Sequence, residues 1–116
     1  MNSMFHNAYV FNSDISNWDV GNVTNMGYMF NNANVFNSDI SNWNTGNVTD
    51  MNDMFFQAQV FNSDISNWNT SNVRRFGMGY MFNDAKAFNQ DLSQWCVTNI
   101  PFMIVTGKPN LSNIID

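Results

Sequence analysis

The sequence predicts an α/β solenoid of about four 25-residue repeats. Three observations predict it: landmark residues recur at a constant spacing, most of them are apolar, and Asn falls between them. A repeat of this length is typical of chains in which each unit stacks on the next and buries a shared core. We expect a right-handed coil with short parallel strands and short helical or 3₁₀ turns.

The repeat is clearest from tryptophan, which stands at positions 18, 43, 68 and 95, with spacings of 25, 25 and 27 residues. Three copies of Phe-Asn-Ser-Asp-Ile-Ser-Asn-Trp, at 11–18, 36–43 and 61–68, are identical. The last interval holds two extra residues between Val73 and Met81. We expect an inserted loop near 76–80 that points outward, because an insertion in the core wall would break the stacking with both neighbours.

Within one repeat the apolar spacing predicts one strand and one helical segment. Ile15, Trp18 and Val20 follow the rhythm of leucine-rich repeats, in which an apolar-x-apolar pair marks a short strand. We expect this strand at 18–20 and at the matching place in later repeats, with neighbouring strands parallel and about 4.8 Å apart. Residues 26–36 have apolar steps of three and four, which predict a helical or 3₁₀ turn.

The repeats are expected to span residues 1–103, and residues 104–116 are expected to form a cap or a tail. Met1, Met4 and Phe5 align with the middle of the next repeat, so the first coil is expected to be partial. An uncapped end exposes apolar side chains and unpaired strand edges. We therefore expect either further residues upstream or another molecule over that end.

Composition excludes several classes of protein. The 116 residues carry a net charge of −5, and no basic patch could neutralise phosphates, so no nucleic-acid partner is expected. No apolar stretch reaches the roughly 18 residues of a membrane span, and no export signal is recognisable. Hydrophobic residues make up 44% of the chain and can build a core, which argues against disorder.

The sequence offers no catalytic constellation. It has no Glu, no histidine cluster, no Cys-x-x-Cys and no glycine-rich phosphate loop. His6 and Cys96 belong to repeats at least about 14 Å apart by strand spacing, too far for a base and a nucleophile. We therefore expect a non-enzymatic protein without a cofactor.

Aspartates recur at the same position of each repeat, and the repulsion between their like charges must be offset. Asp14 recurs as Asp39, Asp64 and Asp91. Either each carboxylate accepts backbone N–H groups in its own Asx-turn, or calcium lies between the coils. We favour the Asx-turn, because calcium-binding repeats of this kind are rich in Gly. The tryptophans are likewise expected in the core rather than on a stacking platform for sugars.

The side chains that flank the inward strand positions form a polar, nearly uncharged strip rich in amides. Such a strip suits hydrogen bonding to glycans or to extended polar peptides. The alternative is an Asn ladder with a purely structural role. The candidate ligand-binding residues are Asn17, Asp19, Asn42, Asn44, Asn67, Asn69 and Gln94.

The complete unit resembles the 25-residue repeat of BspA-like leucine-rich-repeat surface proteins, which is found in bacterial surface lipoproteins. The resemblance rests on Met-x-x-Met-Phe-x-x-Ala-x-x-Phe-Asn-x-Asp-Ile-Ser-x-Trp-x-Val-x-Asn-Val-Thr-x-Met and covers residues 1 to 103. It implies a leucine-rich-repeat-like fold at the cell surface or outside the cell, used in adhesion or ligand binding.

Two functions follow from these expectations. The first is a non-enzymatic adhesion module that presents the amide-rich strip to a surface glycan or a protein ligand. The second is a structural protein that self-associates end to end through its uncapped ends into a filament, or that acts as a rigid surface spacer.

Overall fold

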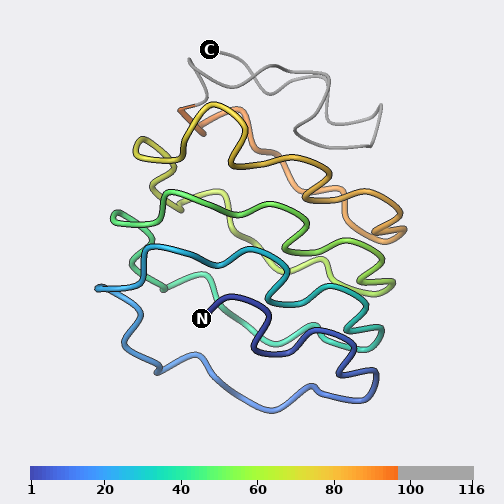
Figure 1. The fold of residues 1–116 in the computed structure, drawn as a ribbon. Helices are drawn as coiled ribbons and strands as arrows, with labels where there is room; N and C mark the ends of the chain where they lie inside the picture. Colours follow the sequence, from blue (N-terminus) through green and yellow to red (C-terminus); the bar gives the residue numbers. More distant parts are fainter. Residues whose placement is uncertain (97–116) are drawn as a thin grey trace.

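The computed structural model describes residues 1–96, in which the repeats lie on top of one another as layers built from turns (Figure 1). We call residues 1–25 layer 1, 26–50 layer 2, 51–77 layer 3 and 78–96 layer 4. Equivalent residues of neighbouring layers lie one above the other, so that contacts join residues about 25 positions apart, or 27 between layers 3 and 4.

Backbone hydrogen bonds join each layer to the next at every second residue of one segment. At the start of layer 2 the N–H groups of four alternate residues donate over 2.8–2.9 Å to carbonyl oxygens 24 positions further on, from Asp50 at the end of layer 2 to Phe56 in layer 3. These donors are Met26, Tyr28, Phe30 and Asn32. The residues between them, such as Met29, donate to the carbonyl three positions earlier in the same layer. One set of N–H groups therefore closes turns, and the other set holds the layers together.

The turns of this segment have a left-handed backbone at their third residue. Within residues 1–96, eight residues other than glycine have φ between 52° and 60°. They are Ser3, Asn7, Tyr28, Asn32, Asp53, Gln57, Tyr80 and Asp84. In layers 1 to 3 each of them donates its N–H to the next layer. A left-handed residue costs roughly 1–2 kcal/mol, and the interlayer hydrogen bond offsets that cost.

The predicted α/β solenoid of leucine-rich-repeat type is wrong. Residues 1–96 contain no helix and no strand, and the one β-bridge among them pairs Asn25 with Asp50 in parallel. A helix over 26–36 is excluded because Tyr28 and Asn32 have positive φ angles. The apolar steps of three and four, which predicted that helix, arise from consecutive turns closed by hydrogen bonds over three residues.

The strand expected at 18–20 is absent as well, and these residues lie between two turns. The Trp18 N–H donates to the Ile15 carbonyl, and the Gly21 N–H donates to Oδ1 of Asp19. Local turns thus engage the backbone groups that a strand would present to its neighbour.

The core consists of columns in which a side chain packs against its own copy in the next layer. Phe30 and Phe55 stack with ring centroids 5.6 Å apart, and within layer 2 Phe30 also stacks on Phe36 at 4.0 Å. Offset parallel rings bury a large area per residue. The methionines that line these columns with no exposed area are Met26, Met29, Met51, Met54, Met78 and Met81.

The tryptophans add a hydrogen bond to their column. Trp43 is 4% exposed, and its indole Nε1–H donates to the Ile15 carbonyl in the layer before it, at 3.1 Å. Trp68 and Trp95 make the same contact one and two layers further on. The prediction that these tryptophans belong to the core is confirmed. Trp18, in layer 1, is 41% exposed.

Polar side chains connect the layers outside the core. Oδ1 of Asn12 accepts the Asn37 N–H at 2.7 Å, and Oδ1 of Asn37 accepts the Asn62 N–H at 2.8 Å. Thr45 is buried and donates its hydroxyl to the Asn69 carbonyl. No buried side-chain nitrogen or oxygen in residues 1–96 lacks a hydrogen-bond partner.

No part of residues 1–96 forms a helix long and apolar enough to cross a membrane. The expected cap or tail at 104–116 lies outside the described residues, as does the end of the repeat region at 97–103.

We predict that Trp43→Ala lowers the free energy of unfolding by roughly 3–5 kcal/mol, because the change removes a buried ring and its hydrogen bond. Urea unfolding measures the loss. Trp18→Ala is the control, and its greater exposure predicts a much smaller loss. Equal losses would contradict the burial of Trp43.

A second prediction concerns the left-handed residues. Gln57 has a φ of 55°, which glycine adopts without steric cost and valine does not. Gln57→Val should be less stable than Gln57→Gly by roughly 1–2 kcal/mol in urea unfolding. At Gln59, which is not among the left-handed residues, the same two substitutions should not show this order. Valine as stable as glycine at position 57 would refute the left-handed assignment.

Candidate ligand-binding surfaces

The seven residues of the predicted strip are all exposed, although no strand carries them. They form two columns on either side of the tryptophan column. The first column contains Asn17, Asn42, Asn67 and Gln94, and the second contains Asp19, Asn44 and Asn69. The structure therefore brings these residues together on one side of the layers, with equivalent residues one layer apart.

The second column has a structural role. Oδ1 of Asp19, Asn44 and Asn69 accepts the backbone N–H two residues further on, at 3.0–3.1 Å. Each side chain thus closes an Asx-turn. Its acceptor oxygen is already engaged, which leaves this column less to offer to a ligand.

The asparagine side chains of the first column close no turn. Within the described residues, no hydrogen bond engages the side chains of Asn17, Asn42 or Asn67, and all three are exposed. Each amide keeps both a donor and an acceptor for other molecules. Asparagine side chains outside the strip do join neighbouring layers, as in the contacts of Asn12 and Asn37 with the next layer.

A second candidate surface lies where the repeat is interrupted. The Arg74 N–H donates to the Thr49 carbonyl, as the Thr49 N–H does to the Thr24 carbonyl one layer earlier. The Gly77 carbonyl accepts the Met51 N–H. The flanking residues therefore keep the register of the layers, and the two extra residues are Arg75 and Phe76.

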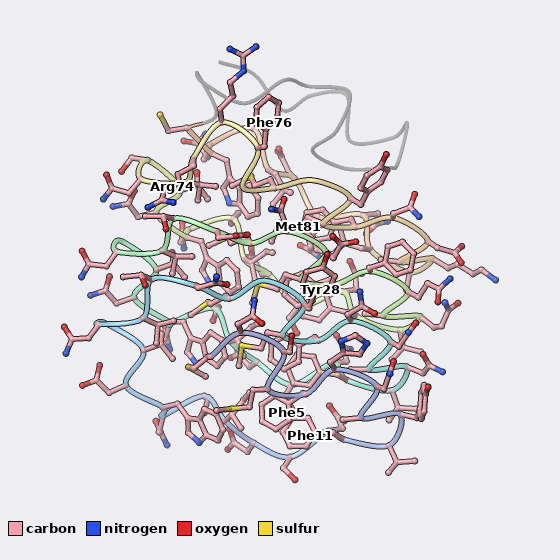
Figure 2. All side chains as sticks on the ribbon, viewed as in Figure 1. Phe5, Phe11, Tyr28, Arg74, Phe76 and Met81 are labelled. Carbon is pink, nitrogen blue, oxygen red and sulfur yellow. The ribbon has the colours of Figure 1, made fainter. Side chains whose placement is uncertain are left out.

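These extra residues form a projecting turn. It is closed by the Gly77 N–H, which donates to the Arg74 carbonyl at 2.8 Å. Phe76 is 61% exposed, and Figure 2 shows its ring at the edge of the molecule. The Arg75 guanidinium carbon lies 5.3 Å from the centroid of that ring. A cation at this distance is attracted to an aromatic ring.

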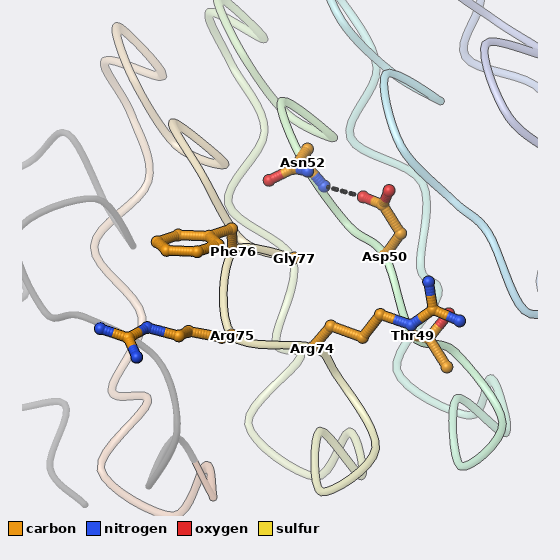
Figure 3. A pocket seen from close by; sticks show the side chains of 7 residues that line it. All are labelled: Thr49, Asp50, Asn52, Arg74, Arg75, Phe76 and Gly77. Atoms are coloured by element: carbon orange, nitrogen blue, oxygen red, sulfur yellow. Dashed lines mark hydrogen bonds between the residues drawn. The ribbon is translucent and has the colours of Figure 1, made fainter.

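A pocket of about 280 Å³ opens beside this turn (Figure 3). Thr49 and Asp50 at the end of layer 2 and Asn52 of layer 3 line one side of it, and the turn from Arg74 to Gly77 lines the other. The lining residues are Thr49, Asp50, Asn52, Arg74, Arg75, Phe76 and Gly77. Sequence reasoning noticed the interrupted spacing but assigned it no function. The signal was present, since Arg74 and Arg75 are the only arginines in the sequence.

The aspartate column consists of Asx-turns, as the sequence predicted. Oδ1 of each aspartate accepts the backbone N–H of the serine two residues further on, at 2.9 Å. The serine hydroxyl and this N–H lower the pKa of Asp14, Asp39 and Asp64. Asp14 and Asp64 act on Asp39 in the opposite sense, because their charges raise its pKa.

Titratable side chains outside the aspartate column include Asp53, His6 and Cys96, which lie in different layers. Burial raises the pKa of Asp53, while a hydrogen bond from Tyr28 opposes the shift. The rings of His6 and Tyr28 stack at 6.1 Å, and Cys96 is exposed in layer 4. Among residues 1–96 no three His, Cys, Asp or Glu side chains lie close enough to hold a metal ion.

The lowered aspartate pKa values predict a loss of stability in acid. A carboxylate with a lower pKa in the folded state stabilises the fold above its unfolded pKa, near 3.9, and loses this contribution as the pH falls through the folded pKa. The melting temperature should therefore fall between about pH 5 and pH 2. Asp53 has a raised pKa, so its contribution to stability becomes more favourable as the pH falls.

The triple variant Asp14→Asn, Asp39→Asn, Asp64→Asn is the control for this prediction. The amide oxygen can still close each turn, but it does not titrate, so the melting temperature should depend less on pH in this range. The same pH dependence in the variant and the native chain would show that other groups are responsible.

Comparison with known proteins gives one match. A family model described as Mycoplasma protein of unknown function, DUF285, matches residues 1–95. No curated protein and no solved structure matches the sequence. The match does not confirm the resemblance to BspA-like leucine-rich-repeat proteins. It does cover most of the chain, and the protein therefore belongs to the family described as Mycoplasma protein of unknown function, DUF285.

Proposed function

We propose that this protein is a non-enzymatic binding module that presents its amide-rich strip to a glycan or an extended polar peptide. One observation carries the proposal: Asn17, Asn42 and Asn67 are exposed, lie in register and make no side-chain hydrogen bond within the described residues. Groups that are held in place but left without a partner are suited to a ligand.

The chemistry of the strip supports a ligand rich in hydroxyl or amide groups. An amide side chain donates and accepts hydrogen bonds, as do sugar hydroxyls and peptide groups. Asn42 and Asn67 directly precede the buried Trp43 and Trp68, so their backbone is anchored to the core, which reduces the ordering cost of binding. Repetition along the layers lets a polymer make the same contact several times.

A position at the cell surface is part of this proposal. The resemblance of the repeat to BspA-like surface proteins supports it, as does a ligand class that is typical of cell surfaces.

A second candidate function is end-to-end association. Met4 and Trp18 of layer 1 are 50% and 41% exposed, whereas their equivalents Met29 and Trp43 are 0% and 4% exposed. Layer 1 thus presents apolar side chains that a further layer would cover, and Phe5 and Phe11 lie at this end of the stack (Figure 2). Another copy of the chain is a candidate for that role.

We predict that Asn42→Ala with Asn67→Ala weakens binding to any glycan found on an array by about tenfold or more. The variant removes several hydrogen bonds of about 0.5–1.5 kcal/mol each. Its melting temperature should be unchanged. Val35→Ala with Val60→Ala is the matched control, since both valines are exposed in the same two layers on another column.

The outcomes separate the two candidates. Unchanged binding by the Asn42 and Asn67 variant would refute the strip as the binding surface. If no glycan or peptide binds, and light scattering shows a mass that grows with concentration, end-to-end association is the better account.

A further inference from the structure

We propose that the pocket beside the Arg74–Gly77 turn binds a single sugar ring that carries a carboxylate, such as a hexuronate unit of an acidic glycan. The proposal is independent of the amide-rich strip, because it concerns different residues at the interruption of the repeat. It rests on the size of the pocket, its aromatic rim and its mixture of polar groups.

The size of the pocket limits the ligand. Its volume of about 280 Å³ lies just below the roughly 300–1,000 Å³ typical of ligand pockets. One sugar ring is of suitable size, whereas the rest of a longer chain would have to lie outside. The turn that forms the pocket has no counterpart between layers 1 and 2, where Thr24 and Asn25 continue directly into Met26.

The rim offers an aromatic surface. Phe76 is 61% exposed although an apolar ring at a turn gains nothing from contact with water. Arg75 lies at the ring, 5.3 Å from its centroid, so that the turn presents a ring and a guanidinium as one unit. An exposed ring of this kind can pack against the apolar C–H face of a sugar.

The wall of the pocket offers both acceptors and donors. Oδ1 of Asp50 accepts the Asn52 N–H at 2.9 Å, as drawn in Figure 3, and its second oxygen has no partner within the described residues. Oδ1 of Asn52 accepts the Gly79 N–H at 2.6 Å, and its amide NH₂ has no partner there. An unpaired acceptor beside an unpaired donor matches vicinal hydroxyl groups, each of which donates and accepts.

Arg74 supplies the contact for the carboxylate. In Figure 3 its side chain extends along the pocket toward Thr49, away from Arg75. No ion pair joins it to Asp50 within residues 1–96, so its guanidinium donors remain available for a bidentate bond to a carboxylate. Two arginines and one aspartate give this pocket a positive balance in a chain whose net charge is −5. A simple inorganic anion would make no use of Asp50 or of the ring.

The test compares methyl β-glucuronide with methyl β-glucoside, which differ only at C6, where the first has a carboxylate and the second a hydroxymethyl group. Titration of the full chain, followed by amide NMR shifts, should show the glucuronide binding at least about tenfold more tightly, with shifts confined to 49–52 and 74–79. Arg74→Gln should abolish this preference. Phe76→Ala should weaken both ligands. Neither variant should change the melting temperature, since both side chains are exposed.

The chain also provides its own control. Deletion of Arg75 and Phe76 restores the uninterrupted 25-residue spacing found between layers 1 and 2, and should remove binding while the fold is kept. The Asn42 and Asn67 variant should bind the glucuronide normally, which separates this pocket from the strip.

Several results would overturn the proposal. They are equal binding of the two glycosides, no binding of either at millimolar concentration, and a preference that survives Arg74→Gln. Inorganic phosphate or a short Glu-rich peptide bound as tightly as the glucuronide would also overturn it, by showing a general anion site.

Discussion

Backbone hydrogen bonds between equivalent parts of neighbouring repeats hold the layers in register and set the conformation of each layer. They take every second N–H of the segment that begins at Met26, so neither a helix nor a strand within the layer can use them. They also require a left-handed backbone at residues such as Tyr28 and Asn32. A conformation that is costly for a single residue persists because each layer repeats it and gains a hydrogen bond from it.

The same constraint explains the composition of the core. Because each side chain lies above its own copy, residues that pack well against themselves are favoured, and flat rings do so by offset stacking. Flexible Met side chains fill the space beside the rings. Repetition also makes the surface uniform, so a pocket of distinct shape is found where the repetition is interrupted, at Arg75 and Phe76.

Sequence reasoning identified the buried residues well and the local backbone poorly. The burial of Trp43 and the Asx-turn of Asp39 follow from the repeat and from the chemistry of the side chains, and both are present. The helix was wrong because an apolar step of three or four is shared by helices and by consecutive turns. The strand was wrong because an apolar-x-apolar pair also fits the short extended stretch between two turns. For the candidate surfaces, exposure was predictable, but the division into a structural column with Asn44 and an unengaged column with Asn42 was not.

The period, most of the residues that face the core and the place where the register breaks could all be predicted from the sequence. These are properties of spacing and polarity, which are visible in one dimension. Only the tertiary structure decided which N–H groups bond within a layer and which bond to the next, which amides remain without partners, and that Arg74, Phe76 and Asp50 share a pocket. The physical reason is that hydrogen bonds between layers join residues about 25 positions apart, and their direction depends on backbone angles that residue types such as Tyr and Gln do not reveal.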